Sequence, residues 1–297
     1  MSERIGFIGV GLMGHGMAKN LVEKGHPLTL LGHRNRAPID DLVRRGAKEA
    51  GSAEEVAGSS DIVFLCVTGS PEVEALVRGP HGLEAGAHRG LCIVDCSTSD
   101  PASTIALAAE LDPLGVAFCD APLGGTPQQG EEGKLSAMVG CDEAVWPRLE
   151  RVIACWAAKS VRVGPAGDGH KMKLLMNFVG MGYAALYSEL LSVARKVGLE
   201  PATVDGALRG SRMDCGFYQT FFRWVLERDR EAHKFSIANA HKDMRYLAAL
   251  AANAGIANPM GSAVKNYFAA AEATGHGGDF VPMLSDIVAA MNGISLK

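Results

Sequence analysis

Short apolar runs alternate with amphipathic segments along the first half of the chain. The apolar runs are rich in β-branched residues and predict strands at 5–9, 27–31, 62–67, 91–96 and 116–119. Helical spacing between them predicts helices at 14–24, 39–45, 53–58, 72–78 and 101–111. This alternation predicts a parallel, doubly wound sheet of the α/β class. Two weaker apolar runs are candidates for further strands, at 136–139 and 160–163.

The pattern changes after Gly164. From residue 170 to 197 it is helical and mostly apolar, without a convincing strand signal. Further helical segments follow at about 201–209, 215–228, 236–253, 260–274 and 281–292. The sequence therefore predicts an α/β domain over residues 1–164 and an all-helical domain over residues 165–297.

Composition narrows the class of protein. Of the 297 residues, 47% are hydrophobic and 21% charged, which is typical of a globular chain. A net charge of −4 lacks the basic footprint of a nucleic-acid-binding protein. The apolar stretches are interrupted before the roughly 18 residues that a membrane span needs, so no membrane partner is expected. Seven Cys without a C-x-x-C pair indicate reduced thiols and a cytoplasmic location, and the nine His show no metal-ligand spacing.

A glycine motif follows the first predicted strand and opens the first helix. It reads Gly9-Val10-Gly11-Leu12-Met13-Gly14, the G-x-G-x-x-G spacing of a Rossmann-type dinucleotide site. The first glycine permits a tight turn, the second lets the backbone approach a pyrophosphate, and the third lets helix and strand pack closely. The helix N-terminus then offers free N–H groups to the phosphates.

The loop after the second strand bears on the choice between NAD and NADP. NAD sites usually carry an acid here, but this chain has Gly32, followed by His33, Arg34 and Arg36. A loop rich in arginine suits the extra phosphate of NADP, so NADP is favoured and NAD stays possible. A solvated basic loop is the alternative interpretation.

Polar residues also end the third and fourth long strands, at Val67-Thr68 and Ser97-Thr98. Ligands of such sheets bind beyond the carboxyl ends of the strands. Val67, Thr68 and Thr98 are therefore candidate cofactor contacts, although isolated Ser and Thr residues more often serve turns.

Several longer motifs resemble those of the β-hydroxyacid dehydrogenases. That family includes 3-hydroxyisobutyrate dehydrogenases and tartronate-semialdehyde, succinic-semialdehyde and sulfolactaldehyde reductases. The matching segments span nearly the whole chain: GFIGVGLMGHGMAKNL at 6–21, DCSTSDP at 95–101, DAPLGGTP at 120–127, GDGHKMKLLMN at 167–177 and AHKDM at 240–244. The resemblance implies hydride transfer between nicotinamide and a short 3-hydroxy acid or its aldehyde-acid counterpart.

The resemblance implies that Lys173 is the catalytic proton donor and acceptor and that Asn177 is its partner. The spacing agrees, because residues i and i+4 share one helix face. Lys171 is the competing lysine, and a lysine that only reaches from an apolar helix to water is the alternative interpretation. His170, one turn earlier, could tune the site, but a position on the surface of this helix is the favoured expectation.

The predicted substrate loop departs from the family pattern. Gly124, Gly125 and Thr126 stand where many members have Ser-Gly-Gly. The loop N–H groups could still hold a carboxylate, and Thr126 could supply a hydroxyl. Arg212 is a further candidate for holding an anion, against a solvated arginine.

The resemblance also implies that Lys242 lies near the cofactor and that Asp243 helps to fix it. The apolar length of the 170–195 segment predicts burial between the domains and against a second subunit, in a homodimer or homotetramer.

The sequence therefore predicts an NAD(P)-dependent dehydrogenase or reductase with a small-molecule substrate. One alternative is an imine reductase, although those enzymes commonly lack the catalytic lysine. A second alternative is a non-catalytic NADP-sensing module, which the altered substrate loop would suit.

Overall fold

The computed structural model describes residues 2–296 and forms two compact units that join between Lys173 and Leu174. We call the part up to Lys173 the sheet unit and the part from Leu174 the helical unit.

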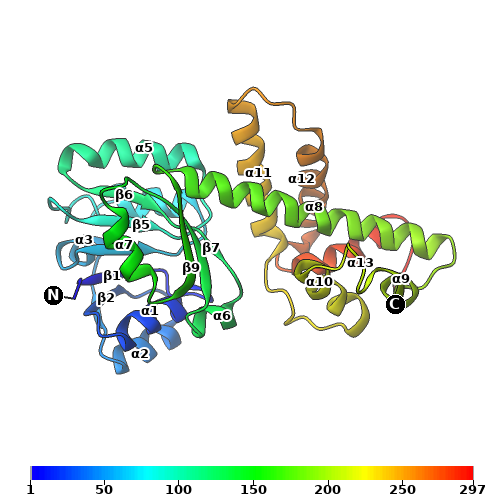
Figure 1. Cartoon of the computed structure of the whole chain (residues 1–297), viewed down its shortest axis with the longest axis horizontal. Coiled ribbons are helices and arrows are strands. Elements are labelled where there is room, and N and C mark those ends of the chain that lie inside the picture. Colours follow the sequence, from blue (N-terminus) through cyan, green and yellow to red (C-terminus); the bar gives the residue numbers. More distant parts are fainter. Residues whose placement is uncertain (1, 297) are drawn as a thin grey trace. The chain divides into compact units, whose positions relative to one another are not determined.

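A mixed sheet forms the centre of the sheet unit (Figure 1). Its strands are β1 (Ile5–Ile8), β2 (Leu28–Leu31), β3 (Lys48–Ala50), β4 (Ile62–Leu65), β5 (Cys92–Asp95), β6 (Ala117–Asp120), β7 (Leu123–Gly124), β8 (Leu135–Gly140) and β9 (Ala157–Gly164). Their order is β3-β2-β1-β4-β5-β6-β8-β7, with β9 beside β8. The order reverses between β1 and β4, which is where open α/β sheets bind ligands.

The predicted parallel sheet is confirmed for β1 to β6, where every pairing is parallel. It needs correction beyond β6, because β8 runs antiparallel to β6 and β7. Short strands β3 and β7 were not predicted, since their three and two residues are too few to show an apolar period.

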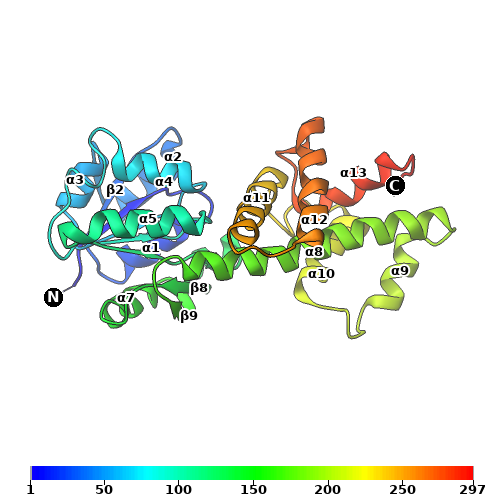
Figure 2. The same ribbon diagram turned by 90° about the horizontal axis from the view of Figure 1, so that it is seen from above.

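Helices cover both faces of the sheet, as Figure 2 shows. Apolar side chains of α1, α2 and α7 pack on one face, and those of α3, α4 and α5 pack on the other. This is the doubly wound arrangement expected from the alternating pattern. The bounds are α1 (Gly14–Glu23), α2 (Arg36–Arg44), α3 (Ala53–Gly58), α4 (Ser70–Arg78), α5 (Pro101–Leu111), α6 (Pro127–Glu131) and α7 (Trp146–Ile153).

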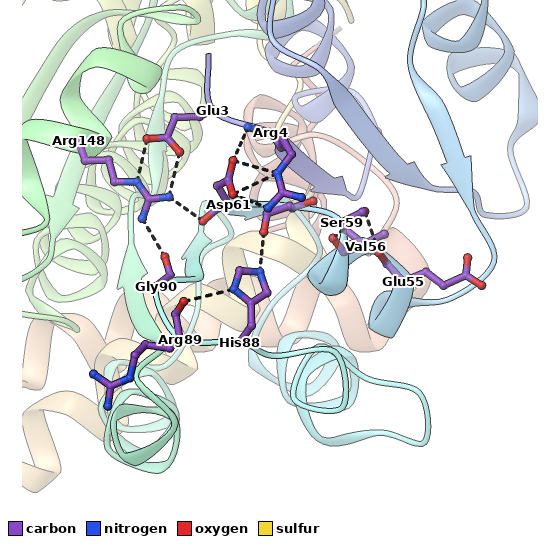
Figure 3. A network of polar contacts seen from close by, with 11 residues as sticks. Glu3, Arg4, Glu55, Val56, Ser59, Asp61, His88, Arg89, Gly90 and Arg148 are labelled. Atoms are coloured by element: carbon purple, nitrogen blue, oxygen red, sulfur yellow. Dashed lines mark hydrogen bonds and ion pairs between the residues drawn. The ribbon is translucent and has the colours of Figure 1, made fainter. Parts of the chain in front are cut away.

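Ion pairs join the loops that precede β1, β4 and β5, at what we call the amino edge of the sheet (Figure 3). Arg148 donates to both carboxylate oxygens of Glu3 at 2.9 Å, to the Asp61 carbonyl at 3.0 Å and to the Gly90 carbonyl at 2.9 Å. Arg4 donates to the Asp61 carboxylate at 2.6 Å. Arg148 of α7 therefore links the three loops that lead into β1, β4 and β5.

The helical unit contains most of α8 (Asp168–Lys196), which begins in the sheet unit. Its other helices are α9 (Pro201–Leu208), α10 (Gly216–Glu227), α11 (Ile237–Asn253), α12 (Pro259–Ala271) and α13 (Leu284–Met291). The core is aromatic: Tyr187 packs edge-on against Phe221, with ring centroids 5.4 Å apart, and Tyr218 lies 4.3 Å from Phe222. The expected all-helical second half is confirmed.

By length and composition alone, α8 is long and apolar enough to cross a membrane, contrary to the sequence expectation. The core helix of a folded domain meets the same criterion. Met181, Ala184 and Leu191 of α8 are buried in the core of the helical unit, which gives this apolar character a packing role.

Candidate active site

The glycine motif forms the turn between β1 and α1, and each glycine meets a different requirement. Gly9 has φ +99°, and a Cβ there would lie 2.2 Å from the Cys66 carbonyl oxygen. A Cβ on Gly14 would lie 2.0 Å from the Gly9 oxygen. A Cβ on Gly11, in contrast, would meet no atom within 4 Å. The first and third glycines therefore build the turn, and the second leaves open space above it.

The start of α1 faces this open space. Leu12 is 68% exposed, and the side chain of Met13, the residue before the helix, makes no capping hydrogen bond within residues 2–296. Uncapped N–H groups and the positive end of the helix dipole suit a pyrophosphate. The residues present therefore fit a dinucleotide.

The arginine loop after β2 holds a carboxylate that the sequence interpretation missed. Arg36 donates to both oxygens of Glu49, at 2.6 and 2.8 Å, and to Asp40 at 3.1 Å. This pairing lowers the pKa of Glu49. A Cβ on Gly32 would lie 2.0 Å from a Glu49 oxygen, so a carboxylate from β3 lies beside the end of β2. His33 and Arg34 are exposed beside it.

The ends of β4 and β5 are tied together at the opposite, carboxyl edge of the sheet. The Val67 N–H donates to the Ser97 hydroxyl at 3.0 Å, and the Ser97 N–H donates to Asp95 at 2.8 Å. Thr68 is exposed and Thr98 is half-buried. This edge therefore keeps two threonines near the surface on a fixed backbone.

The predicted substrate loop lies between β7 and α6. Gly125 has φ +125°, which favours glycine. Thr126 caps α6: its hydroxyl accepts from the Gln129 N–H at 3.3 Å, and its own N–H donates to the Gln129 side chain at 2.9 Å. The Thr126 hydroxyl proton is still able to reach a ligand, but its N–H is used in the cap.

The two lysines of α8 have different partners. Lys173 donates from Nζ to the Leu123 carbonyl at 2.7 Å, which holds its amine at the β7 loop. Lys171 pairs with Asp168 at 2.7 Å, and its side chain is 41% exposed. Lys173, and not Lys171, therefore lies beside the predicted substrate loop.

His170, expected at the surface, is fully buried, so that prediction is wrong. The expectation failed because helical spacing shows which residues share a face but not what covers that face.

The helical unit brings Asn177 and Lys242 to one carboxylate. Asn177 donates to Asp243 at 2.6 Å, and the Lys242 amine lies 3.0 Å from the other Asp243 oxygen. The side chain of Asp243 is 1% exposed and that of Lys242 12% exposed. Arg212 is exposed between α9 and α10. Asp243 therefore orients two of the predicted site residues.

The fold and the glycine turn define a dinucleotide-binding α/β protein, and comparison with known proteins identifies its family as one of NAD(P)-dependent oxidoreductases. The family described as the NAD-binding domain of 6-phosphogluconate dehydrogenase matches residues 4–164. The family described as the NAD-binding domain of NADP-dependent 3-hydroxyisobutyrate dehydrogenase matches residues 167–286. The chain belongs to the 3-hydroxyisobutyrate dehydrogenase-like β-hydroxyacid dehydrogenases.

Individual relatives agree. A 2-hydroxy-3-oxopropionate reductase of Escherichia coli (strain K12) is 34% identical over 81% of this chain and 82% of its own. A 2-(hydroxymethyl)glutarate dehydrogenase of Eubacterium barkeri is 29% identical over 100% of this chain and 98% of its own. The solved 3-hydroxyisobutyrate dehydrogenase of Mycobacterium tuberculosis shares the fold, with a TM-score of 0.86 at 24% identity over 97% of this chain and 99% of its own.

Proposed function

We propose that the protein reduces a short aldehyde-carboxylate to a 3-hydroxy acid, or runs the reverse oxidation, with Lys173 as the proton donor. The observation that carries this proposal is the position of the Lys173 amine, 2.7 Å from the Leu123 carbonyl and beside the loop Gly124–Thr126. If the loop binds the carboxylate of a short aldehyde acid, the aldehyde group of the same molecule would lie within reach of that amine.

Each residue has a separate task in this mechanism. A nicotinamide cofactor, when bound, would supply the hydride that reduces the carbonyl carbon. Lys173 donates a proton from Nζ to the carbonyl oxygen as negative charge develops there, and the neutral amine takes the proton back in the oxidation. N–H groups of Gly124 and Gly125 and the Thr126 hydroxyl bind the carboxylate. Asn177, oriented by Asp243, hydrogen-bonds the substrate.

The test is consumption of NADPH and of NADH with a panel of three- and four-carbon aldehyde acids, cyclic imines and simple aldehydes. Turnover confined to aldehyde acids supports the proposal. Turnover of the imines alone would favour an imine reductase. Tight cofactor binding without turnover of any compound would favour a sensing module.

We also propose a preference for NADP, with Gly9, Gly11, Leu12, Met13 and Gly14 around the pyrophosphate. His33, Arg34 and Arg36 would face the ribose phosphate, while Val67, Thr68, Thr98 and Lys242 would contact the rest of the cofactor. Arg36 must exchange Glu49 for the phosphate, so Glu49 tunes the preference. Glu49→Gln should tighten NADPH binding several-fold and leave NADH binding nearly unchanged. Weaker NADPH binding in this variant would contradict the role given to Arg36.

We further propose that two copies pair along α8. Six exposed apolar residues of the helical unit follow alternating steps of three and four: Met176, Val179, Tyr183, Leu186, Leu190 and Val193. This period of 3.5 is that of a helix–helix seam. Light scattering should give the molar mass of a dimer or tetramer, and Leu186→Glu should shift the oligomeric state toward the monomer. A monomeric wild-type protein would sink the proposal.

A cytoplasmic location is proposed from the free thiols of all seven cysteines. Cell fractionation that places the protein outside the cytoplasm would contradict it.

A further inference from the structure

His170 lies at the start of α8 with its whole side chain buried. Its Nε2 donates to the Ser97 carbonyl at 3.2 Å, and its Nδ1 lies 2.8 Å from the Thr104 hydroxyl. Two carboxylates face the ring: Asp95, 3.7 Å from Nε2, and Asp120, 3.6 Å from Nδ1. The imidazole thus links the loop after β5, helix α5 and the first turn of α8.

Asp120, the last residue of β6, holds the backbone of the same turn. Its two oxygens accept from the N–H groups of Gly167 and His170, both at 2.6 Å. A Cβ on Gly169 would lie 2.4 Å from the Met138 carbonyl oxygen, so this turn is pressed closely against the sheet. The start of α8 is therefore fixed by its backbone and by one side chain.

Lys173 follows His170 by three residues, so the two lie on neighbouring turns of one helix face. The distance from the Lys173 amine to the Leu123 carbonyl depends on where this turn sits. We propose that His170 is a positioning residue, which clamps the first turn of α8 so that the Lys173 amine stays at the β7 loop. The inference rests on the proposed role of Lys173.

The test compares three variants. His170→Leu removes both polar contacts of the ring, whereas His170→Gln keeps a donor that can reach the Ser97 carbonyl. Thr104→Val keeps the imidazole but removes its Nδ1 contact, together with the 3.3 Å hydrogen bond from Thr104 to the Asp100 carbonyl, and is the milder variant if His170→Leu folds poorly. We expect His170→Leu to lower kcat about 10- to 100-fold, the scale of a misplacement near 1 Å, with the KM for cofactor unchanged. His170→Gln should restore most of the rate.

A double-mutant cycle separates positioning from a general loss of structure. In the Lys173→Ala background, His170→Leu should cause no further loss of kcat, because its effect acts through Lys173. Val152→Ala, a buried change in α7 of the same unit, serves as a control that destabilises without slowing the reaction. An equal loss in both backgrounds, or a wild-type kcat in a folded His170→Leu, would overturn the inference.

A second readout needs no turnover. Acetic anhydride labelling followed by mass spectrometry gives the ratio of Lys173 to Lys171 modification, with Lys171 as the internal reference. The ratio should rise in His170→Leu and stay near wild type in His170→Gln. An unchanged ratio in His170→Leu would contradict the clamp. If the wild-type protein turns over no aldehyde acid, the proposed function fails, and this ratio still decides whether His170 positions Lys173.

Discussion

At the amino edge of the sheet, charged side chains form ion pairs with one another and hydrogen bonds with the backbone. These contacts link the loops of that edge to one another. At the carboxyl edge, buried polar groups hold backbone turns in place and leave other groups facing outward. Arg148 and Arg4 serve the first edge (Figure 3). Gly11, Ser97 and Lys173 serve the second. If the proposed function is right, the amino edge serves stability and the carboxyl edge serves the reaction, so substitutions at the two edges should have different consequences.

The largest expected effect is on the chemistry at the carboxyl edge. Lys173→Ala removes the proposed proton donor, so kcat should fall about 10²- to 10⁴-fold with little change in cofactor affinity. Lys171→Ala is the matched control, because its side chain pairs with Asp168 away from the loop. Steady-state assays of both variants check the prediction, and equal losses would erase the distinction between the two lysines.

The next effect is on stability at the amino edge. Arg148→Leu should lower the free energy of unfolding by about 1–3 kcal/mol, since Glu3 and two carbonyls lose a charged donor. The kcat should stay near wild type. Arg44→Leu, a change at a 71% exposed side chain, should cost less than about 0.5 kcal/mol in the same urea titration. A large loss of activity in an Arg148→Leu variant that is fully folded would contradict the division of roles between the two edges.

A smaller effect concerns acid stability of the same edge. The Arg4 guanidinium lowers the pKa of Asp61 from its ordinary value of 3.8. The ionised carboxylate therefore stabilises the fold above about pH 4, and this stabilisation is lost as the pH falls through the lowered pKa. The free energy of unfolding of the wild type should exceed that of Asp61→Asn by about 0.5–1 kcal/mol at pH 7, and this difference should disappear in acid below the lowered pKa. A constant difference across this range would assign the effect to something other than ionisation.

Turns that depend on neighbouring residues could be predicted from the sequence, whereas contacts between distant residues could not. The glycine turn could be predicted, because the positive φ of Gly9 and the close approach of Gly14 to the Gly9 oxygen both arise within six residues. Glu49 could not, since its contact with Arg36 depends on the pairing of β2 with β3. His170 was misplaced for a similar reason: its partner Thr104 is 66 residues away in the chain. Contacts that depend on the sheet leave no periodic signal.

The most direct test of the carboxyl edge as the working edge is a fluorescence titration with NADPH, and in parallel NADH, of wild type and Gly11→Val. A Cβ at Gly11 would meet no protein atom within 4 Å, so we expect the variant to unfold close to the wild-type temperature. The account predicts tight binding to wild type, strongest for NADPH, and loss of binding in a fully folded Gly11→Val. Undiminished binding in that variant, or no binding of either nucleotide to wild type, would contradict it.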